Sequence, residues 1–134
     1  MELIREINKG KTIKNPIDIY NYLKEFKNED KEFFIVIGLD TKNKPCYREV
    51  VSIGILNASL VHAREVFKKA IVMSCNSIIL AHNHPSGDLE PSGEDLETTN
   101  SLRLAGDVIG IKVLDHIIVG KKGYKSILEN EGRF

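Results

Sequence analysis

The sequence predicts an α/β fold in which a mixed β-sheet is flanked by helices. Apolar runs of strand length alternate with segments whose apolar residues recur every three or four positions. The resulting order is helix, two strands, helix, strand, helix, two strands. No internal repeat or linker divides the 134 residues, a length that is sufficient for one sizeable core. We therefore expect one domain over 16–134, preceded by an N-terminal extension over 1–15.

The first half of the domain is predicted to contain a hairpin between two helices. Asn15 and Pro16 provide a capping side chain and a first-turn proline, which favour a helix start. A continuous run of apolar, β-forming residues then indicates a strand that is covered on both faces. A partner strand and an amphipathic helix follow. These elements are predicted over 16–27 (helix), 32–39 and 46–55 (strands) and 62–73 (helix).

The second half changes between strand and helix in the same way. The apolar run from Ile78 to Ala81 is typical of a buried strand. Gly110 is a natural stop for the long helix that comes after it. The predicted ranges are 77–82 (strand), 93–108 (helix), and 112–119 and 124–127 (strands).

Two histidines follow the buried strand. Side chains of an extended segment alternate between faces, so His82 and His84 are expected to project the same way and Asn83 the opposite way. Prolines and glycines between Pro85 and Pro91 then take the chain out of the sheet. Two imidazoles would thus converge at the end of a strand, where α/β sheets commonly place their functional sites.

Ser92 and Asp95 have the spacing of a helix capping box. A helix that begins there would aim Asp95 back toward the strand end that carries His82 and His84. Two nitrogens and one carboxylate oxygen are the protein ligands of a catalytic zinc site, which leaves its fourth position to water. Taken separately, the histidines fit a polar loop and the Ser-x-x-Asp pair fits a simple cap. Their combination favours a metal site.

Hydrolysis at such a site needs a proton carrier. A zinc ion lowers the pKa of its water, and a carboxylate that is not a ligand can pass the proton to the leaving amine. Glu32, at the mouth of an apolar strand, is the best candidate for this general base, with Glu49 and Glu65 as competitors. The Ser92 hydroxyl is a candidate donor to the developing oxyanion, in addition to or instead of capping its helix.

Composition excludes several classes of protein. The chain is 42% hydrophobic and 28% charged, lacks a signal-peptide pattern and has no stretch of membrane-spanning length, so we expect a cytoplasmic protein without a membrane partner. Its 19 basic residues balance 19 acidic ones, which does not support strong nucleic-acid binding. Cys46 and Cys75 have no Cys-x-x-Cys partners, which excludes a zinc ribbon and indicates free thiols.

The distant glutamate, the His-x-His-Pro and the Ser-x-x-Asp resemble the JAMM signature of the JAB/MPN metalloproteases. Further residues look like the RadC-type branch of that family. The resemblance is carried by Glu32, His82-Asn83-His84-Pro85-Ser86-Gly87-Asp88, Glu90-Pro91-Ser92, Asp95 and Leu114-Asp115-His116-Ile117-Ile118-Val119-Gly120. It covers about residues 32–127 and implies the cytidine-deaminase-like architecture of JAB/MPN domains.

The resemblance also implies a set of roles. One Zn²⁺ per chain would be bound by His82, His84 and Asp95. Glu32 would be the general base, ahead of the two competing glutamates, and Ser92 the oxyanion donor. The substrate would be a peptide or protein, cleaved at a peptide or isopeptide bond.

Some features depart from the family pattern or remain open. Leu89 stands where proline is usual in that loop. For Asp115 and His116 we expect structural roles, one side chain pointing inward and the other outward; a part in substrate binding is the alternative. No helix-hairpin-helix segment of the kind that precedes this domain in full-length RadC proteins is found, so we expect the domain to stand alone. The oligomeric state is left open.

Three functions compete. The leading prediction is a zinc-dependent hydrolase of the JAMM type. Because the traditional label of RadC-like proteins is DNA repair, a nucleic-acid-linked protein is the second hypothesis. The contiguous His-Asn-His is not the dispersed HNH nuclease motif, and a zinc deaminase is excluded because its Pro-Cys-x-x-Cys ligands are missing. The third hypothesis is a metal-stabilised interaction module without turnover, for which Glu32 would be dispensable.

Overall fold

The computed structural model describes residues 4–6, 11–54 and 61–129 and has an α/β fold. Its strands are β1 (Ile4–Glu6), β2 (Phe33–Leu39), β3 (Pro45–Ile53), β4 (Ser77–Asn83), β5 (Lys112–Gly120) and β6 (Gly123–Ser126). Its helices are α1 (Pro16–Tyr22), α2 (Ala63–Val72) and α3 (Gly93–Ile109), and a 3₁₀ turn, η1 (Lys24–Phe26), follows α1. None of the described helices is both long and apolar enough to span a bilayer.

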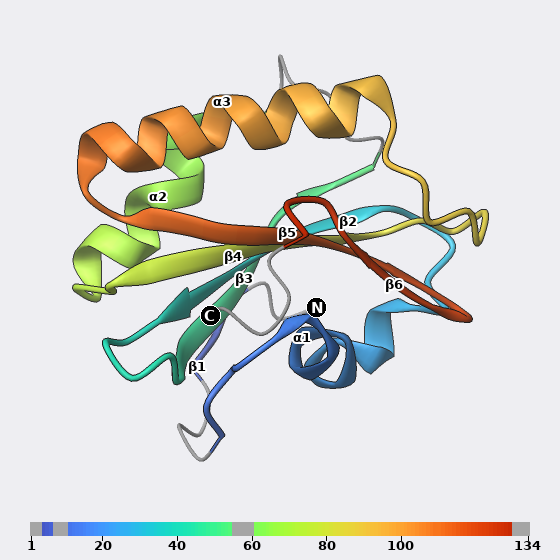
Figure 1. Cartoon of the computed structure of the whole chain (residues 1–134), viewed down its shortest axis with the longest axis horizontal. Helices are drawn as coiled ribbons and strands as arrows, with labels where there is room; N and C mark the ends of the chain where they lie inside the picture. The colour runs from blue at the N-terminus through green and yellow to red at the C-terminus, as the bar shows by residue number, and fades with distance from the viewer. Residues whose placement is uncertain (1–3, 7–10, 55–60, 130–134) are drawn as a thin grey trace.

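The strands form one mixed sheet with helices on both faces, as predicted. Its order is β1-β3-β2-β4-β5-β6. The β4–β5 pair is parallel and all other neighbouring strands are antiparallel. Helices α2 and α3 lie over one face and α1 lies over the other (Figure 1). The end of β4 lies close to the start of α3, and the candidate site is found there.

The N-terminal part differs from the prediction in two ways. The segment 1–15, expected to be an extension, contributes β1, which pairs with β3; most of its other residues lie outside the described part, as does the end of the predicted strand at residue 55. The predicted helix over 16–27 ends at Tyr22 and continues as the tighter η1. This winding places the ring of Phe26 5.4 Å from that of Phe33.

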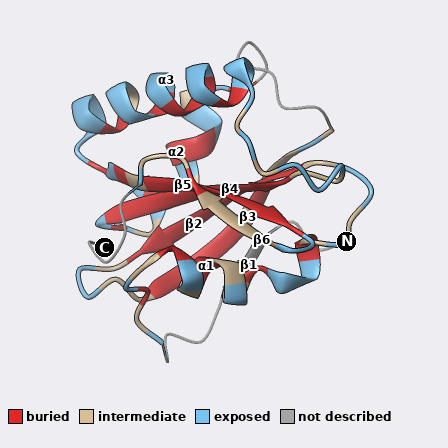
Figure 2. Cartoon of the chain, turned by 45° about the vertical axis from the view of Figure 1, so that its right-hand side comes forward, coloured by how far each residue is buried: buried red, intermediate tan, exposed pale blue. Residues whose placement is uncertain are grey.

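Strand β2 is buried at every position, because its alternate side chains enter two different cores (Figure 2). Phe34 and Val36 pack toward α2 and α3, whereas Ile35 and Ile37 pack toward α1. Cys46 and Cys75 are both buried and are not joined in a disulfide. The central strand predicted from a continuous apolar run is therefore confirmed.

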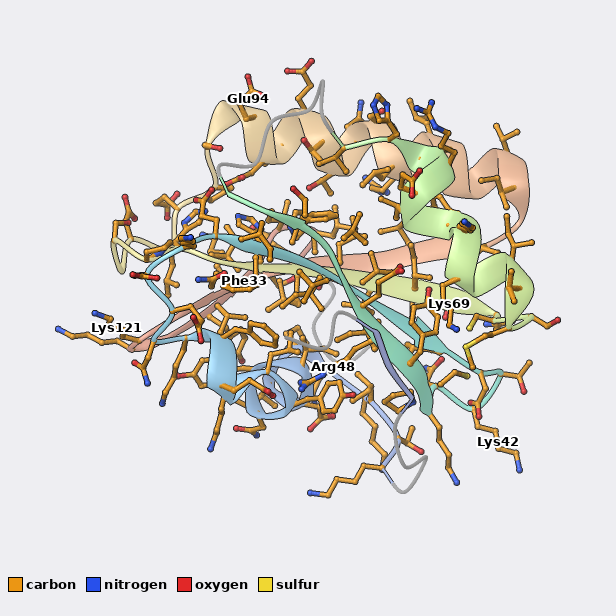
Figure 3. All side chains as sticks on the ribbon, turned by 180° about the vertical axis from the view of Figure 1, so that it is seen from behind. Phe33, Lys42, Arg48, Lys69, Glu94 and Lys121 are labelled. Atoms are coloured by element: carbon orange, nitrogen blue, oxygen red, sulfur yellow. The ribbon has the colours of Figure 1, made fainter. Side chains whose placement is uncertain are left out.

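A charged contact ties η1 to the sheet. The guanidinium of Arg48, in β3, donates two hydrogen bonds to the carboxylate of Glu25, at 2.6 and 2.8 Å. It also lies 5.4 Å from the ring centre of Tyr22 and 5.5 Å from that of Phe26, on the α1 side of the sheet (Figure 3). The segment that leads into β2 is thereby held against the sheet.

Candidate metal centre

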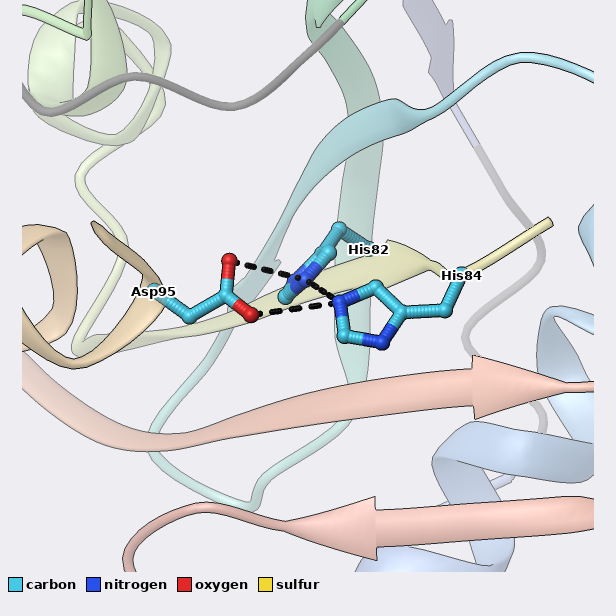
Figure 4. A group of neighbouring side chains, drawn as sticks. All are labelled: His82, His84 and Asp95. Carbon is cyan, nitrogen blue, oxygen red and sulfur yellow. Dashed lines mark hydrogen bonds and ion pairs between the residues drawn. The ribbon is translucent and has the colours of Figure 1, made fainter. Parts of the chain in front are cut away.

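The candidate metal centre lies where β4 ends and α3 begins (Figure 4). His82 is the second-to-last residue of β4, and His84 directly follows the strand. Ser92 caps α3: its hydroxyl accepts a hydrogen bond from the Asp95 N–H at 3.0 Å, and its own N–H donates to the Asp95 carboxylate at 2.8 Å. The predicted capping box is confirmed, and it aims Asp95 at the two histidines.

The three side chains meet at one buried point. His82 Nε2 lies 2.9 Å from His84 Nε2 and 3.3 Å from Asp95 Oδ1, and His84 Nε2 lies 3.1 Å from Asp95 Oδ2. Tetrahedral zinc with bonds of about 2.0 to 2.1 Å requires ligand atoms about 3.3 Å apart. The donor types and their spacing therefore fit a cation such as Zn²⁺, with one ligand position left for a solvent molecule or substrate.

Electrostatics at this point favour a positive charge. Burial by itself would raise the pKa of the Asp95 carboxyl, but the neighbouring side chains of His82 and His84 and the Ser92 backbone lower it far below its ordinary value. The hydrogen bond to Asp95 raises the pKa of His84 despite its burial, and the Asp88 carbonyl acts in the same direction. Both directions favour a positive charge at the point where the three side chains meet.

The loop between β4 and α3 orients His84. The Nδ1 of His84 lies 2.6 Å from the carbonyl oxygen of Asp88, which can only accept, so Nδ1 donates and Nε2 remains available to a cation. Leu89, in the same loop, packs against the β5–β6 turn. A Cβ added to Gly120 would lie 2.7 Å from Leu89 Cδ2, so the absence of a side chain at Gly120 makes room for this anchor.

A pocket of about 360 Å³ opens beside His84 and Asp95 and includes Glu32. Neither competing glutamate lines it. Glu65 is exposed on α2, and Glu49 is half-buried in β3, where burial raises its pKa. Of the three predicted candidates for the general base, the structure thus brings only Glu32 to the site. The pocket is lined by Glu32, His84, Ser86, Asp88, Glu90, Ser92, Glu94 and Asp95.

The middle residue of the His-Asn-His segment holds the backbone around Glu32, a function that sequence reasoning missed. Asn83 Oδ1 accepts a hydrogen bond from the N–H of Phe33 at 2.7 Å, and its Nδ2 donates to the carbonyl oxygen of Lys31 at 2.8 Å. The carbonyl of Glu32 itself accepts from the Gly54 N–H at 2.8 Å. One buried amide therefore links both neighbours of Glu32 to the strand that carries the histidines.

Ser92 combines a cap with a place at the pocket wall. Capping uses its hydroxyl oxygen as an acceptor for the Asp95 N–H. A serine hydroxyl also has one proton to donate, so capping does not prevent it from donating toward the pocket. The two roles considered for Ser92 are therefore compatible.

Asp115 and His116 are both fully buried, so the expectation that one of them points outward is wrong. The sheet is covered on both faces, and β5 also carries a bulge. Between the pairs Ile78–Val113 and Leu80–His116, β4 advances by two residues and β5 by three. The extra residue interrupts the alternation of faces on which the expectation depended.

The two residues differ in what they contact. Asp115 accepts hydrogen bonds from the N–H groups of His116 at 2.7 Å and Leu128 at 3.0 Å and from the Ser126 hydroxyl, and so fastens the chain after β6. His116 instead contacts His82, and its other ring nitrogen contacts Thr99. Burial, and next the nearby His82, hold the pKa of His116 well below its ordinary value. Thr99 lies four residues after Asp95 in α3, and this spacing is the one sequence signal that could have placed Thr99 near the candidate metal centre.

The fold and the three converging side chains define an α/β domain with a candidate metal centre. A family model described as the RadC-like JAB domain matches residues 13–133, and the chain belongs to that family. It is 51% identical over 124 residues to a UPF0758 protein of Chlorobium phaeovibrioides, which covers 92% of this chain and 56% of that protein.

Two other relatives match with similar identity and similar coverage. The chain is 47% identical over 131 residues to the UPF0758 protein SH1266 of Staphylococcus haemolyticus, covering 97% of this chain and 57% of that protein. It is 50% identical over 121 residues to a UPF0758 protein of Methanosarcina mazei, covering 90% and 52% respectively. The chain therefore spans about half the length of the curated relatives it matches.

Proposed function

We propose that the domain is a metal-dependent hydrolase of the JAMM type that cleaves a peptide or isopeptide bond. The observation that carries the proposal is the convergence of His82, His84 and Asp95 on one point at the wall of a pocket that also contains Glu32. Two imidazoles and one carboxylate suit a catalytic zinc ion, and we expect one Zn²⁺ per chain. When bound, the ion would polarise a carbonyl and make water a better nucleophile.

Glu32 is the residue that we assign to proton transfer. Glu32 lines the pocket and does not belong to the converging group of three, which suits a base that is not a metal ligand. The hydrogen bonds of Asn83 to the residues on either side hold its backbone in place. From this position Glu32 takes a proton from the attacking water and returns it to the leaving amine.

Ser92, which also lines the pocket, supports the same reaction. Its capping hydrogen bond fixes the position of the hydroxyl at the start of α3. The hydroxyl proton then serves as a donor to the negative charge that develops on the substrate carbonyl oxygen. Ser92 thus positions Asp95 and stabilises the reacting group with one side chain.

The charge of the pocket supports a polypeptide substrate rather than a nucleic acid. Five of its lining residues are carboxylic acids: Glu32, Asp88, Glu90, Glu94 and Asp95. At the rim, the ammonium group of Lys125 lies 3.5 Å from the Glu90 carboxylate. A phosphodiester backbone would bring further negative charge into this acidic field, whereas the amide group of a peptide is neutral.

The test compares zinc-loaded wild-type protein with Glu32→Gln and with a matched control, Glu65→Gln, on α2. The substrates are a panel of fluorogenic peptides and ubiquitin-like isopeptide conjugates. We expect Glu32→Gln to keep its zinc and to lose at least about 100-fold in turnover, the range attributed to a general base, while Glu65→Gln retains wild-type activity. Undiminished turnover in Glu32→Gln would remove Glu32 from the mechanism. Zinc-loaded wild-type protein that cleaves no member of the panel would favour an interaction module.

A further inference from the structure

A series of short polar contacts begins at His82 Nδ1, the ring nitrogen that does not face His84 and Asp95. His82 Nδ1 lies 2.7 Å from His116 Nε2, and His116 Nδ1 lies 2.6 Å from Thr99 Oγ1. The Thr99 hydroxyl in turn lies 2.7 Å from the backbone carbonyl oxygen of Asp95. All three side chains are 2% exposed or less, so water does not compete for these contacts.

The direction of each of these hydrogen bonds follows from the last acceptor in the series, the backbone carbonyl of Asp95. A carbonyl oxygen can only accept, so the Thr99 hydroxyl donates its single proton to Asp95 and must accept from His116. His116 therefore carries its proton on Nδ1, and its Nε2 is the acceptor for His82 Nδ1. With its proton on Nδ1, His82 presents an unprotonated Nε2 to the point it shares with His84 and Asp95.

Two local features of the fold bring these hydrogen-bonding residues together. In α3, Thr99 lies four residues after Asp95, so both face the sheet from the same side of the helix. In β5, the bulge before His116 turns its ring onto the face where His82 lies, and the two ring centres are 4.7 Å apart. The helix that supplies the carboxylate of the candidate metal centre thus also supplies the end of the hydrogen-bond chain.

We propose that His116 and Thr99 are positioning residues that hold His82 in the tautomer and orientation required to bind the metal. Neither residue touches the cation; both act through His82. Because removing such an outer partner of a metal-binding histidine weakens metal affinity about 10- to 100-fold, the effect is measurable in binding without any substrate. The proposal rests on the metal site of the proposed function but not on the hydrolysis reaction.

Thr98 provides a matched control. It precedes Thr99 in α3, is equally buried at 2% exposure, and its hydroxyl has no hydrogen-bond partner among the described residues. Thr98→Val and Thr99→Val therefore remove the same group from neighbouring buried positions, but only the second substitution breaks the chain to His82. Thr99→Ser keeps the hydroxyl and removes only a methyl group.

The experiment measures zinc affinity by competition with a chromogenic chelator in the full chain. We expect Thr99→Val and His116→Phe to weaken zinc binding about 10- to 100-fold, and Thr98→Val and Thr99→Ser to remain within about threefold of wild type. Equal affinities of Thr99→Val, Thr98→Val and a zinc-binding wild type would overturn the positioning role and leave the proposed function intact. A wild type that binds no zinc would instead overturn both.

A second readout does not depend on the folding of any variant. Long-range ¹H–¹⁵N correlation spectra of the zinc-loaded wild type distinguish the two neutral tautomers of each histidine. We expect the His82 and His116 protons on Nδ1, with His116 Nε2 showing the shift of a hydrogen-bonded acceptor. A His116 ring protonated on Nε2 would donate to His82 and would overturn the proposal.

Discussion

Asn83→Ala removes the amide that links the metal-site strand to the backbone around Glu32. In the wild type this side chain, 1% exposed, accepts from the Phe33 N–H and donates to the Lys31 carbonyl. The substitution leaves both histidines and Asp95 in place. It therefore tests whether the position of Glu32 depends on Asn83 rather than on the metal site itself.

The expected loss of stability follows from the two hydrogen bonds. Phe33 is buried, so its unpaired N–H costs about 1 to 3 kcal/mol. Lys31 is exposed, so water replaces the lost donor to its carbonyl, and that hydrogen bond contributes about 0.5 to 1.5 kcal/mol. Together, the two losses should lower the free energy of unfolding by about 1.5 to 4.5 kcal/mol.

Urea denaturation of the metal-free protein measures this loss. Asn76→Ala is the control, because Asn76 immediately precedes the same strand but is exposed, and it should unfold within about 0.5 kcal/mol of wild type. Zinc-loaded Asn83→Ala should keep its metal and lose turnover about 10- to 100-fold as Glu32 becomes misplaced. An Asn83→Ala protein as stable as the control would refute the reasoning.

Three further substitutions have directions that the structure determines. Gly38→Ala should lower stability by at least about 1 to 3 kcal/mol in urea titrations, because the new Cβ would lie 2.8 Å from Cys75 Sγ and closer still to the Tyr47 ring. Ser92→Ala removes the α3 cap and should cost about 1 kcal/mol in the same assay. Burial raises the pKa of Glu49, so its ionised form opposes folding. Glu49→Gln should therefore be more stable than wild type at pH 7, and the difference should disappear below about pH 4, where the carboxyl is protonated in both states.

The features that sequence predicted well are those with local causes. The continuous apolar run of β2 requires cover on both faces, and helices lie on both. The pair Ser92 and Asp95 determines where α3 begins, and thereby where the carboxylate points. His82 and His84 follow from the alternation of an extended segment. Each of these inferences needed only a few neighbouring residues.

The features that sequence reasoning missed depend on contacts between distant segments. Asn83 forms hydrogen bonds with the backbone on either side of Glu32, about 50 residues earlier, and no local sequence pattern indicates that pairing. The bulge in β5 depends on the register with β4. The face of the sheet toward which His116 points could therefore not be predicted from the alternation of side chains along β5 alone. The pairing of β1 with β3 likewise joins segments about 40 residues apart.

The central claim is that His82, His84 and Asp95 together hold a metal ion. Its most direct test is native mass spectrometry of the untagged protein after exposure to zinc and removal of excess metal, alongside His82→Ala/His84→Ala and Asp95→Asn. We expect about one zinc per chain in the wild type and a large loss of zinc in both variants. A wild type that retains no zinc, or variants that retain as much as the wild type, would contradict it.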